Sequence, residues 1–181
     1  MAETIWSPPQ IVNRGDYHLS GPRRRDVRRS ERKAVDPDIG VLTARLMFAV
    51  QGELFATLAG QGHPDLRPQH GAVLAYLDPE GSRATELARR SGQHKQVVGK
   101  VLDELEELGY VERRPDPSDR RAKLVVPTAR GLDQMTRSDA ILEAIERGHA
   151  EAVGEDAYAA FKRMYREIVE RQRARRKDAA G

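Results

Sequence analysis

The stretch GYVERRPDPSDRRAKLVVPT, residues 109–128, decides the fold of this chain. Residues 110–114 alternate apolar and polar side chains, which predicts an incoming β-strand, and Leu124, Val125 and Val126 predict a return strand. Between them lie turn formers, residues 115–119 (PDPSD), in which proline fixes φ and Asp or Ser bonds the backbone. The stretch is therefore expected to form a short β-hairpin.

The tip of this predicted hairpin carries two arginines, Arg120 and Arg121. Core packing explains exposed arginines on a thin hairpin poorly. A phosphate backbone or a narrow minor groove explains them well, because both attract guanidinium groups.

Two helices, one short and one longer, are predicted just before the hairpin. Residues 85–92 (TELARRSG) suggest a helix with Thr85 as its N-cap and Gly92 as the turn residue. A longer helix is expected from about His94 to Leu108, because an apolar stripe recurs at helical spacing: Val98, Val101, Leu102, Leu105 and Leu108. Two helices around a glycine turn, followed by a basic hairpin, are typical of a winged helix-turn-helix.

The chain resembles the MarR family of bacterial transcription regulators. The resemblance rests on residues 85–88 (TELA), on the helix after Gly92, and on residues 116–121 (DPSDRR) followed by residues 127–131 (PTARG). It covers roughly residues 36–175 and is sharpest over 82–131. It implies a dimeric, mostly helical regulator that binds a palindromic operator and is often released by a small ligand.

The expected fold is mainly α with a small β-wing: a winged helix-turn-helix DNA-binding unit plus N- and C-terminal dimerisation helices. We expect a basic, flexible arm over residues 1–35, a MarR-like domain over 36–176 and a tail over 177–181. Within the domain, 63–130 form the winged helix, and 36–60 and 128–176 the dimerisation helices.

Further helices are predicted over about 36–59, 67–77, 128–148 and 156–175, and a short first strand over 82–84; the first helix and the last two lie outside the winged helix. The first starts at Asp36-Pro-Asp38, and Thr128 caps the third. The first and the last two helices carry wide apolar faces, which a symmetric dimer can cover. Packing within one protomer is the alternative.

Composition narrows the classes of protein. The chain has 181 residues, 39% of them hydrophobic, no cysteine and a net charge of +3. Disulfides and cysteine-based sensing are thereby excluded. Residues 1–10 lack the pattern of a secretory signal, and the apolar run 46–50 is far too short to span a bilayer. We expect a cytoplasmic protein that binds double-stranded DNA, forms a homodimer and does not associate with membranes.

The two halves of the motif's second helix differ in charge. Its first half is basic or polar, and its second half carries Asp103, Glu104, Glu106 and Glu107, which phosphates would repel. We expect the N-terminal half to enter the major groove, with Gln96 on adenine and Lys95 on guanine or phosphate. The expected DNA-binding residues are Gln93, His94, Lys95, Gln96, Lys100, Arg113, Arg120, Arg121 and Lys123.

The start of this helix departs from the family pattern. Many members carry Ser or Thr there, whereas this chain has Gln93-His94, so base preference does not carry over. His94 either contacts DNA when protonated or serves as an exposed cap. Gly99 either lets the backbone approach the duplex or fills no special role. Asp119 is expected to orient an arginine or shape the turn.

Two further sites are open at this stage. Residues 14–33 carry eight Lys or Arg against three acids, and Arg23, Arg24 and Arg25 could enter a minor groove or stay a solvated tail. An effector pocket is implied by the resemblance only; Phe48, Phe55 and Tyr76 would line it, although such residues often belong to the core.

An enzyme is not expected, because the phosphate-loop, Gly-x-Ser-x-Gly and His-Glu-x-x-His motifs are absent. The five histidines lack ligand spacing, so no metal or cofactor is expected. The sequence therefore favours a sequence-specific regulator, most commonly a repressor. A non-specific architectural binder using the basic arms is the main alternative, and a protein-interaction module is the third.

Overall fold

The computed structural model describes residues 28–178, so the predicted arm residues Arg23, Arg24 and Arg25 lie outside it. The chain divides into two units, residues 1–43 and 44–181, each considered by itself. In the first unit a helix, α1 (Arg29–Val35), lies within the segment expected to be a flexible arm.

Helix α2 (Ile39–Gly60) begins at the predicted acidic start. The backbone N–H of Val41 donates to Asp38 Oδ1 at 3.0 Å, and Lys33 Nζ lies 2.8 Å from Asp38 Oδ2. The lysine therefore lowers the pKa of Asp38. The carboxylate caps α2, as the sequence indicated.

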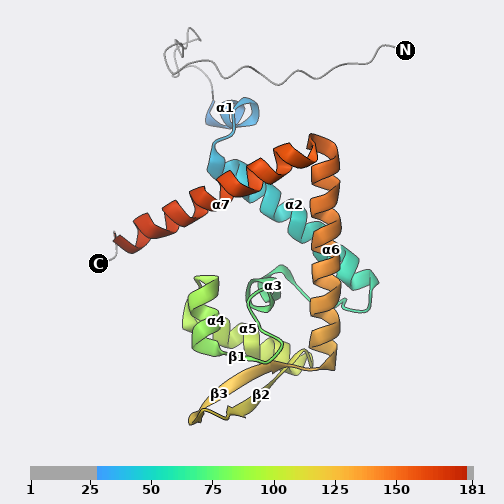
Figure 1. Ribbon diagram of the computed structural model, residues 1–181, viewed down its shortest axis with the longest axis vertical. Helices are drawn as coiled ribbons and strands as arrows, with labels where there is room; N and C mark the ends of the chain where they lie inside the picture. The colour runs from blue at the N-terminus through green and yellow to red at the C-terminus, as the bar shows by residue number, and fades with distance from the viewer. Residues whose placement is uncertain (1–27, 179–181) are drawn as a thin grey trace. The chain divides into compact units, whose positions relative to one another are not determined.

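The second unit holds the C-terminal part of α2 and the remaining elements (Figure 1). The elements follow in this order: α3 (Pro68–Leu74), β1 (Ser82–Arg83), α4 (Ala84–Ser91), α5 (Lys95–Glu107), β2 (Val111–Asp116), β3 (Asp119–Pro127), α6 (Ala129–Val153) and α7 (Glu155–Asp178). The mainly helical fold with a small β-wing is confirmed.

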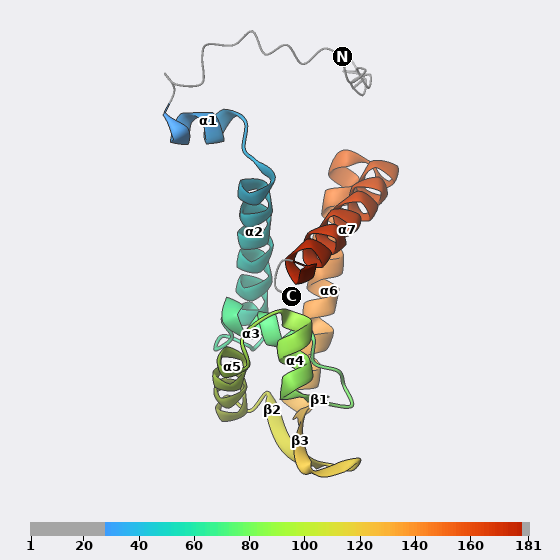
Figure 2. The same cartoon turned by 90° about the vertical axis from the view of Figure 1, so that its left-hand side faces the viewer.

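The three strands form one antiparallel sheet in the order β1-β3-β2. Val125 at the centre of β3 pairs with Ser82 on one side and Arg113 on the other. Figure 2 shows the β2–β3 hairpin extending beyond α4 and α5. This arrangement is a helix-turn-helix, α4 and α5, followed by a wing.

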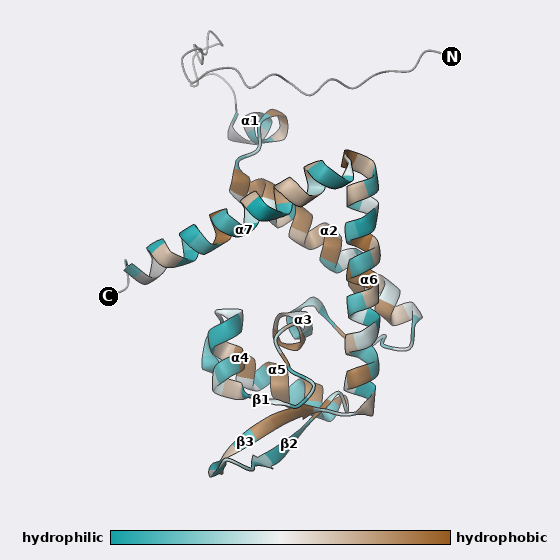
Figure 3. Cartoon of the chain, viewed as in Figure 1, coloured by the Kyte–Doolittle hydropathy of each residue, from teal (hydrophilic) through white to brown (hydrophobic). Residues whose placement is uncertain are grey.

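The core forms where α5 packs against α3, α4 and the base of the wing. Its largest fully buried side chains include Tyr110, Leu58, Leu87, Leu102 and Leu105. Each such side chain contributes on the order of 1.5–3 kcal/mol by burial. Figure 3 shows apolar residues also along α2 and the base of β3. The predicted stripe of α5 is therefore its core face.

Several predicted boundaries hold. The second helix of the motif, expected from about 94 to 108, spans Lys95–Glu107 with His94 as N-cap. Gly92 ends α4 with φ of 70°, and Gly154 separates α6 from α7 with φ of 93°. Thr128 caps α6, accepting the Gly131 N–H at 3.2 Å.

Other expectations were wrong in detail. Thr85 lies inside α4, whose N-cap is Arg83, because β1 keeps that residue extended. The hairpin turn is narrower than residues 115–119, since β2 runs to Asp116 and β3 starts at Asp119. Helix α3 ends at Leu74, not near Leu77, and α6 continues to Val153, not Gly148.

Close packing explains why glycine stands at position 131, three residues after Thr128, where the chain leaves the wing and enters α6. The N–H of Thr128 donates to the Tyr110 carbonyl at 3.0 Å, and its hydroxyl donates to the Gly109 carbonyl at 2.6 Å. These bonds bring α6 so close that a Cβ at Gly131 would overlap the Tyr110 carbonyl oxygen. The glycine is needed for close approach.

We expect Gly131→Ala to lower the free energy of unfolding by about 1–3 kcal/mol, because the added methyl forces α6 off the wing root. Gly148→Ala on the same helix meets nothing within 4 Å and serves as control. It should stabilise by up to ~1 kcal/mol through helix propensity. Urea unfolding measures both, and equal effects would contradict the packing argument.

Candidate nucleic-acid interface

The N-terminal half of α5 presents polar and basic side chains to solvent. His94, Lys95, Gln96 and Lys100 are exposed, and Gln93 is half-buried. Among the described residues, no carboxylate lies within 4.0 Å of the Lys95 ammonium, which faces solvent. A Cβ at Gly99 would meet nothing within 4 Å, so packing within the chain does not require glycine there.

The C-terminal half of α5 is held by its own carboxylates. Glu104 Oε2 accepts from Gln69 at 2.7 Å and from His70 Nε2 at 3.0 Å, and these bonds lower its pKa. His70 Nδ1 accepts the Arg67 N–H at 3.0 Å, so its proton is on Nε2. Glu104 thus attaches α5 to α3.

Arg113 completes this attachment from the wing side. Its guanidinium contacts Glu106 and lies 2.6 Å from Asp103 Oδ1, and the side chain is half-buried. Its backbone N–H also donates to Glu106 Oε1 at 3.1 Å. The structure therefore places Arg113 in an ion pair between β2 and α5, apart from the exposed basic residues of the predicted set.

A buried carboxylate shapes the wing. Asp116 is 4% exposed and accepts from Arg83 Nε at 2.7 Å. Its other oxygen accepts from the N–H of Ser118 at 2.8 Å and from the Ser118 hydroxyl at 2.7 Å. These contacts close the turn and tie it to β1 at the start of α4.

At the wing tip, Arg121 and Lys123 are exposed, while the described structure does not include the side chain of Arg120. Asp119 accepts the Arg121 N–H at 3.0 Å, which fits the expectation that it shapes the turn. The described residues place no carboxylate within ion-pair distance of the Arg121 or Lys123 head groups. Both cations therefore face solvent.

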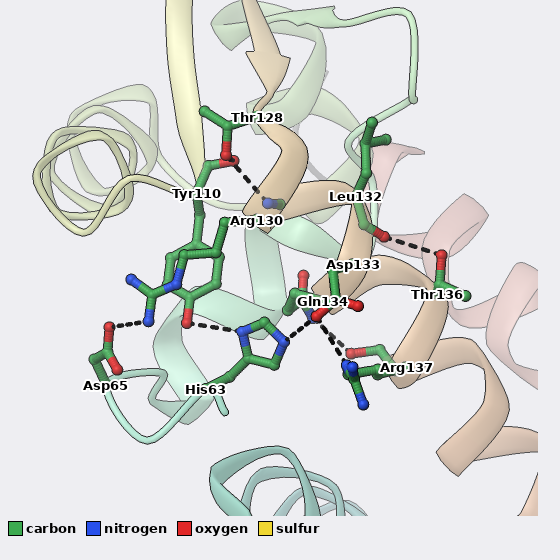
Figure 4. A network of polar contacts seen from close by, with 12 residues as sticks. His63, Asp65, Tyr110, Thr128, Arg130, Leu132, Asp133, Gln134, Thr136 and Arg137 are labelled. Carbon is green, nitrogen blue, oxygen red and sulfur yellow. Dashed lines mark hydrogen bonds and ion pairs between the residues drawn. The ribbon is translucent and has the colours of Figure 1, made fainter. Parts of the chain in front are cut away.

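Sequence inspection missed a polar network behind the wing (Figure 4). Buried His63 lies with Nδ1 3.1 Å from the Tyr110 hydroxyl and Nε2 3.0 Å from Asp133 Oδ2. Asp133 on α6 also accepts from Arg137 at 2.8 Å, and Arg137, then His63, lower its pKa. His63 thereby links Tyr110, the residue before β2, to Asp133 of α6, and the His63–Asp133 contact spans 70 positions of sequence.

Arg130 strengthens the same junction. Its guanidinium lies 4.3 Å from the centre of the Tyr110 ring, donates to the Leu108 carbonyl at 2.6 Å and pairs with Asp65 at 2.8 Å. A partly desolvated cation–π contact contributes about 1 kcal/mol. The start of α6 is thus fixed to the loop before β2.

A cavity of 280 Å³ lies between α2, α3 and α6 within the second unit. Phe55 lines it, packed so closely on Gly71 that a Cβ there would sit 2.9 Å from its ring. Phe48 is exposed, Tyr76 lies beneath Arg90, and neither is among the lining residues. Of the three residues expected for an effector pocket, the cavity includes one.

Residues 28–178 bring together no group of three or more His, Asp or Glu placed to hold a metal ion. Helix α2 is long and apolar enough, by length and composition alone, to cross a membrane. It nevertheless carries Arg45 and Glu53, and its Leu58 is fully buried in the core.

These features define a winged helix-turn-helix domain with exposed basic side chains on α5 and on the wing. The sequence model of the MarR family matches residues 65–122, from α3 to the wing tip. Over these residues the chain matches the MarR family of transcription regulators.

Individual relatives agree. The chain is 27% identical to the HTH-type transcriptional repressor Rv2887 of Mycobacterium tuberculosis, over 75% of this chain and 96% of that one. The structure of CouR from Rhodococcus jostii RHA1 bound to p-coumaroyl-CoA matches with 29% identity and a TM-score of 0.59, covering 72% and 91% of the two chains. A structure of the repressor CouR on a 23-mer DNA duplex matches with 26% identity and a TM-score of 0.62, covering 76% and 96%.

The wing carboxylate gives a pH-dependent prediction. Ser118, then Arg83, hold the pKa of Asp116 at about 2, below its ordinary 3.8. A carboxylate whose pKa is depressed by folding stabilises the fold above its unfolded pKa, and this is lost as pH falls through the folded value. Between about pH 4 and pH 2, the free energy of unfolding of Asp116→Asn should therefore fall less than that of the wild-type protein.

Urea unfolding at several pH values measures this dependence. Glu151→Gln, at an exposed position of α6, should keep the wild-type pH dependence. An Asp116→Asn protein with the wild-type dependence would show that Asp116 does not stabilise the wing as a carboxylate.

Proposed function

We propose that this protein is a homodimeric, sequence-specific repressor that binds a palindromic operator in the cytoplasm and is released by a small-molecule effector. The proposal rests on the difference in charge and contacts between the two halves of α5. Its acidic half is engaged by α3 and β2, which leaves the N-terminal half with Lys95, Gln96 and Lys100 facing solvent. Recognition helices commonly enter the major groove in this way.

The wing supplies the second contact. Arg121 and Lys123 extend from a hairpin whose turn is fixed by Asp116 and Asp119. We assign Arg121 to the minor groove and Lys123 and Arg120 to phosphates. Gln93 and His94 stand at the start of α5, where they reach the duplex edge. Arg113 is also a proposed DNA contact. Because Asp103 and Glu106 hold its guanidinium, we propose that only the part of the side chain outside this ion pair contacts DNA.

Exposed apolar side chains support the dimer. On α7, Phe161, Met164 and Ile168 recur at helical spacing and are 42%, 58% and 51% exposed. Phe48 of α2 is 66% exposed. Contiguous exposed apolar surface on a small protein marks an interaction site. A second copy is the occupant we propose, because two-fold symmetry also places two reading helices on a palindrome.

The cavity beside Phe55 supports the effector. It is bordered by α6, which is joined to the wing root through Asp133, His63 and Tyr110. A ligand that favours one arrangement of α6 must alter affinity for DNA by the factor by which DNA alters affinity for the ligand.

Selection of tight-binding duplexes from a random DNA library, with the purified full chain at physiological salt, tests this function. An inverted repeat with half-sites about 10–10.5 bp apart is expected. Enrichment without a shared motif would favour an architectural binder, and no enrichment would reject DNA as the partner.

Arg121→Ala should weaken binding to the selected duplex by about 1.5–3 kcal/mol, because a charge-assisted contact is lost. The slope of log affinity against log salt should fall by about 1. Arg166→Ala, at an exposed position of α7, is the control with the same charge change. Fluorescence anisotropy over a salt series measures both, and an unchanged slope for Arg121→Ala would remove Arg121 from the interface.

A further inference from the structure

Val97 is an apolar side chain in the polar half of α5. It is the third residue of the helix and is 47% exposed. Of the described residues between 63 and 130, it is the only large hydrophobic residue that is exposed. A single exposed hydrophobic residue on a protein surface needs no explanation by itself. Here, however, it lies among the side chains proposed to contact DNA.

Folding of the chain does not account for valine at position 97. The core face of α5 is formed by other residues, all of them buried: Val98, Val101, Leu102 and Leu105. At an exposed helical position a β-branched residue is less favourable than alanine, leucine or lysine, because its χ1 freedom is restricted. The exposed methyl groups of Val97 are therefore available to an apolar group outside the chain.

The neighbours of Val97 on the exposed side of the helix are polar. Its backbone N–H donates to the His94 carbonyl at 2.9 Å, which places Val97 in the first turn. Gln96 precedes it directly, and Lys100 follows at a spacing of three, which brings side chains together on a helix. Val97 thus lies between an amide and an ammonium, groups that suit adenine and guanine or phosphate in the major groove.

The major groove offers one apolar group to such a side chain. All four bases present hydrogen-bonding atoms there, and only thymine adds a methyl group, at its C5 position. Because thymine pairs with adenine, an amide of Gln96 on adenine would bring Val97 close to a thymine methyl of the same or a neighbouring pair. The first turn of α5 therefore matches an A·T pair in its polar and its apolar features.

We infer that Val97 contacts the 5-methyl group of one thymine in each half-site of the operator and is thereby a specificity-determining residue. The inference rests on the proposed function, because Val97 meets this group only if α5 enters the major groove. Burial of one methyl group corresponds to about a four-fold change in affinity.

Deoxyuridine in place of thymidine removes this methyl group and keeps every hydrogen-bonding atom of the base. Each thymine of the selected duplex is replaced in turn, in both half-sites together, and the affinity of the full chain is measured by fluorescence anisotropy. Replacement at one position should weaken binding about sixteen-fold, four-fold for each half-site, and at other positions less than about two-fold. A duplex in which no thymine methyl matters, or a half-site without thymine, would overturn the inference.

Val97→Ala assigns the methyl contact to this side chain. Alanine is the better helix former, so the variant should fold. It should bind the thymine and uracil duplexes within about two-fold of each other, whereas Val153→Ala, at a 57% exposed position of α6, should keep the sixteen-fold difference. The salt slope of Val97→Ala should stay that of wild type, since no charge is lost, while Lys95→Ala should lower it by about 1. Undiminished sensitivity to uracil in Val97→Ala would assign the methyl to another residue and overturn the inference.

Cytosine and 5-methylcytosine separate the methyl group from the rest of the base pair. With a C·G pair at the sensitive position of both half-sites, methylation of the cytosine should tighten wild-type binding about sixteen-fold and leave Val97→Ala unchanged within about two-fold. Equal affinities of the wild-type protein for the two duplexes would contradict a methyl contact.

The same experiments separate this inference from the function on which it rests. A selected inverted repeat without a methyl-sensitive thymine would keep the regulator and overturn the role of Val97. Failure to select any duplex would reject the proposed function, and the role of Val97 with it.

Discussion

The contacts of Tyr110 are the constraint on which the rest of the second unit depends. Its ring is fully buried, its hydroxyl bonds to His63, and its carbonyl accepts the N–H of Thr128. Since β3 ends at Pro127 and α6 starts at Ala129, these bonds set the direction in which α6 leaves the wing. Gly131 permits the approach, and Arg130 covers the ring. A movement of α6 therefore alters these contacts at the base of the wing.

The charged side chains of α5 also have a structural role. Carboxylates that would repel a phosphate backbone are used to hold the helix, Glu104 against α3 and Glu106 against Arg113 of β2. Arg113 neutralises Glu106 and Asp103, and Gln69 and His70 donate hydrogen bonds to Glu104. Lys95 and Gln96 are exposed at the other end of a helix that these contacts hold in place.

The sequence predicted the reading unit well because its signals are local. The apolar period placed α5 within one residue at each end, and Gly92 and Thr128 marked real helix ends. It failed where the outcome depends on residues far apart. No local pattern indicated that the hairpin brings Arg113 into an ion pair with Asp103 and Glu106. The His63–Asp133 contact spans 70 positions, which no local pattern reports. Phe48 and Phe55, both on α2, looked equivalent in sequence, yet only Phe55 faces the cavity.

We propose that the N-terminal half of α5 contacts DNA and that its C-terminal half does not. The chain contains no cysteine, so single thiols can be placed at either end of this helix without background. Rates of thiol modification in Gln96→Cys and Glu107→Cys proteins, with and without the selected duplex, test the claim directly. We expect the duplex to protect the thiol at position 96 strongly and to leave the rate at position 107 unchanged. Equal protection at both positions, or protection at 107 alone, would contradict it.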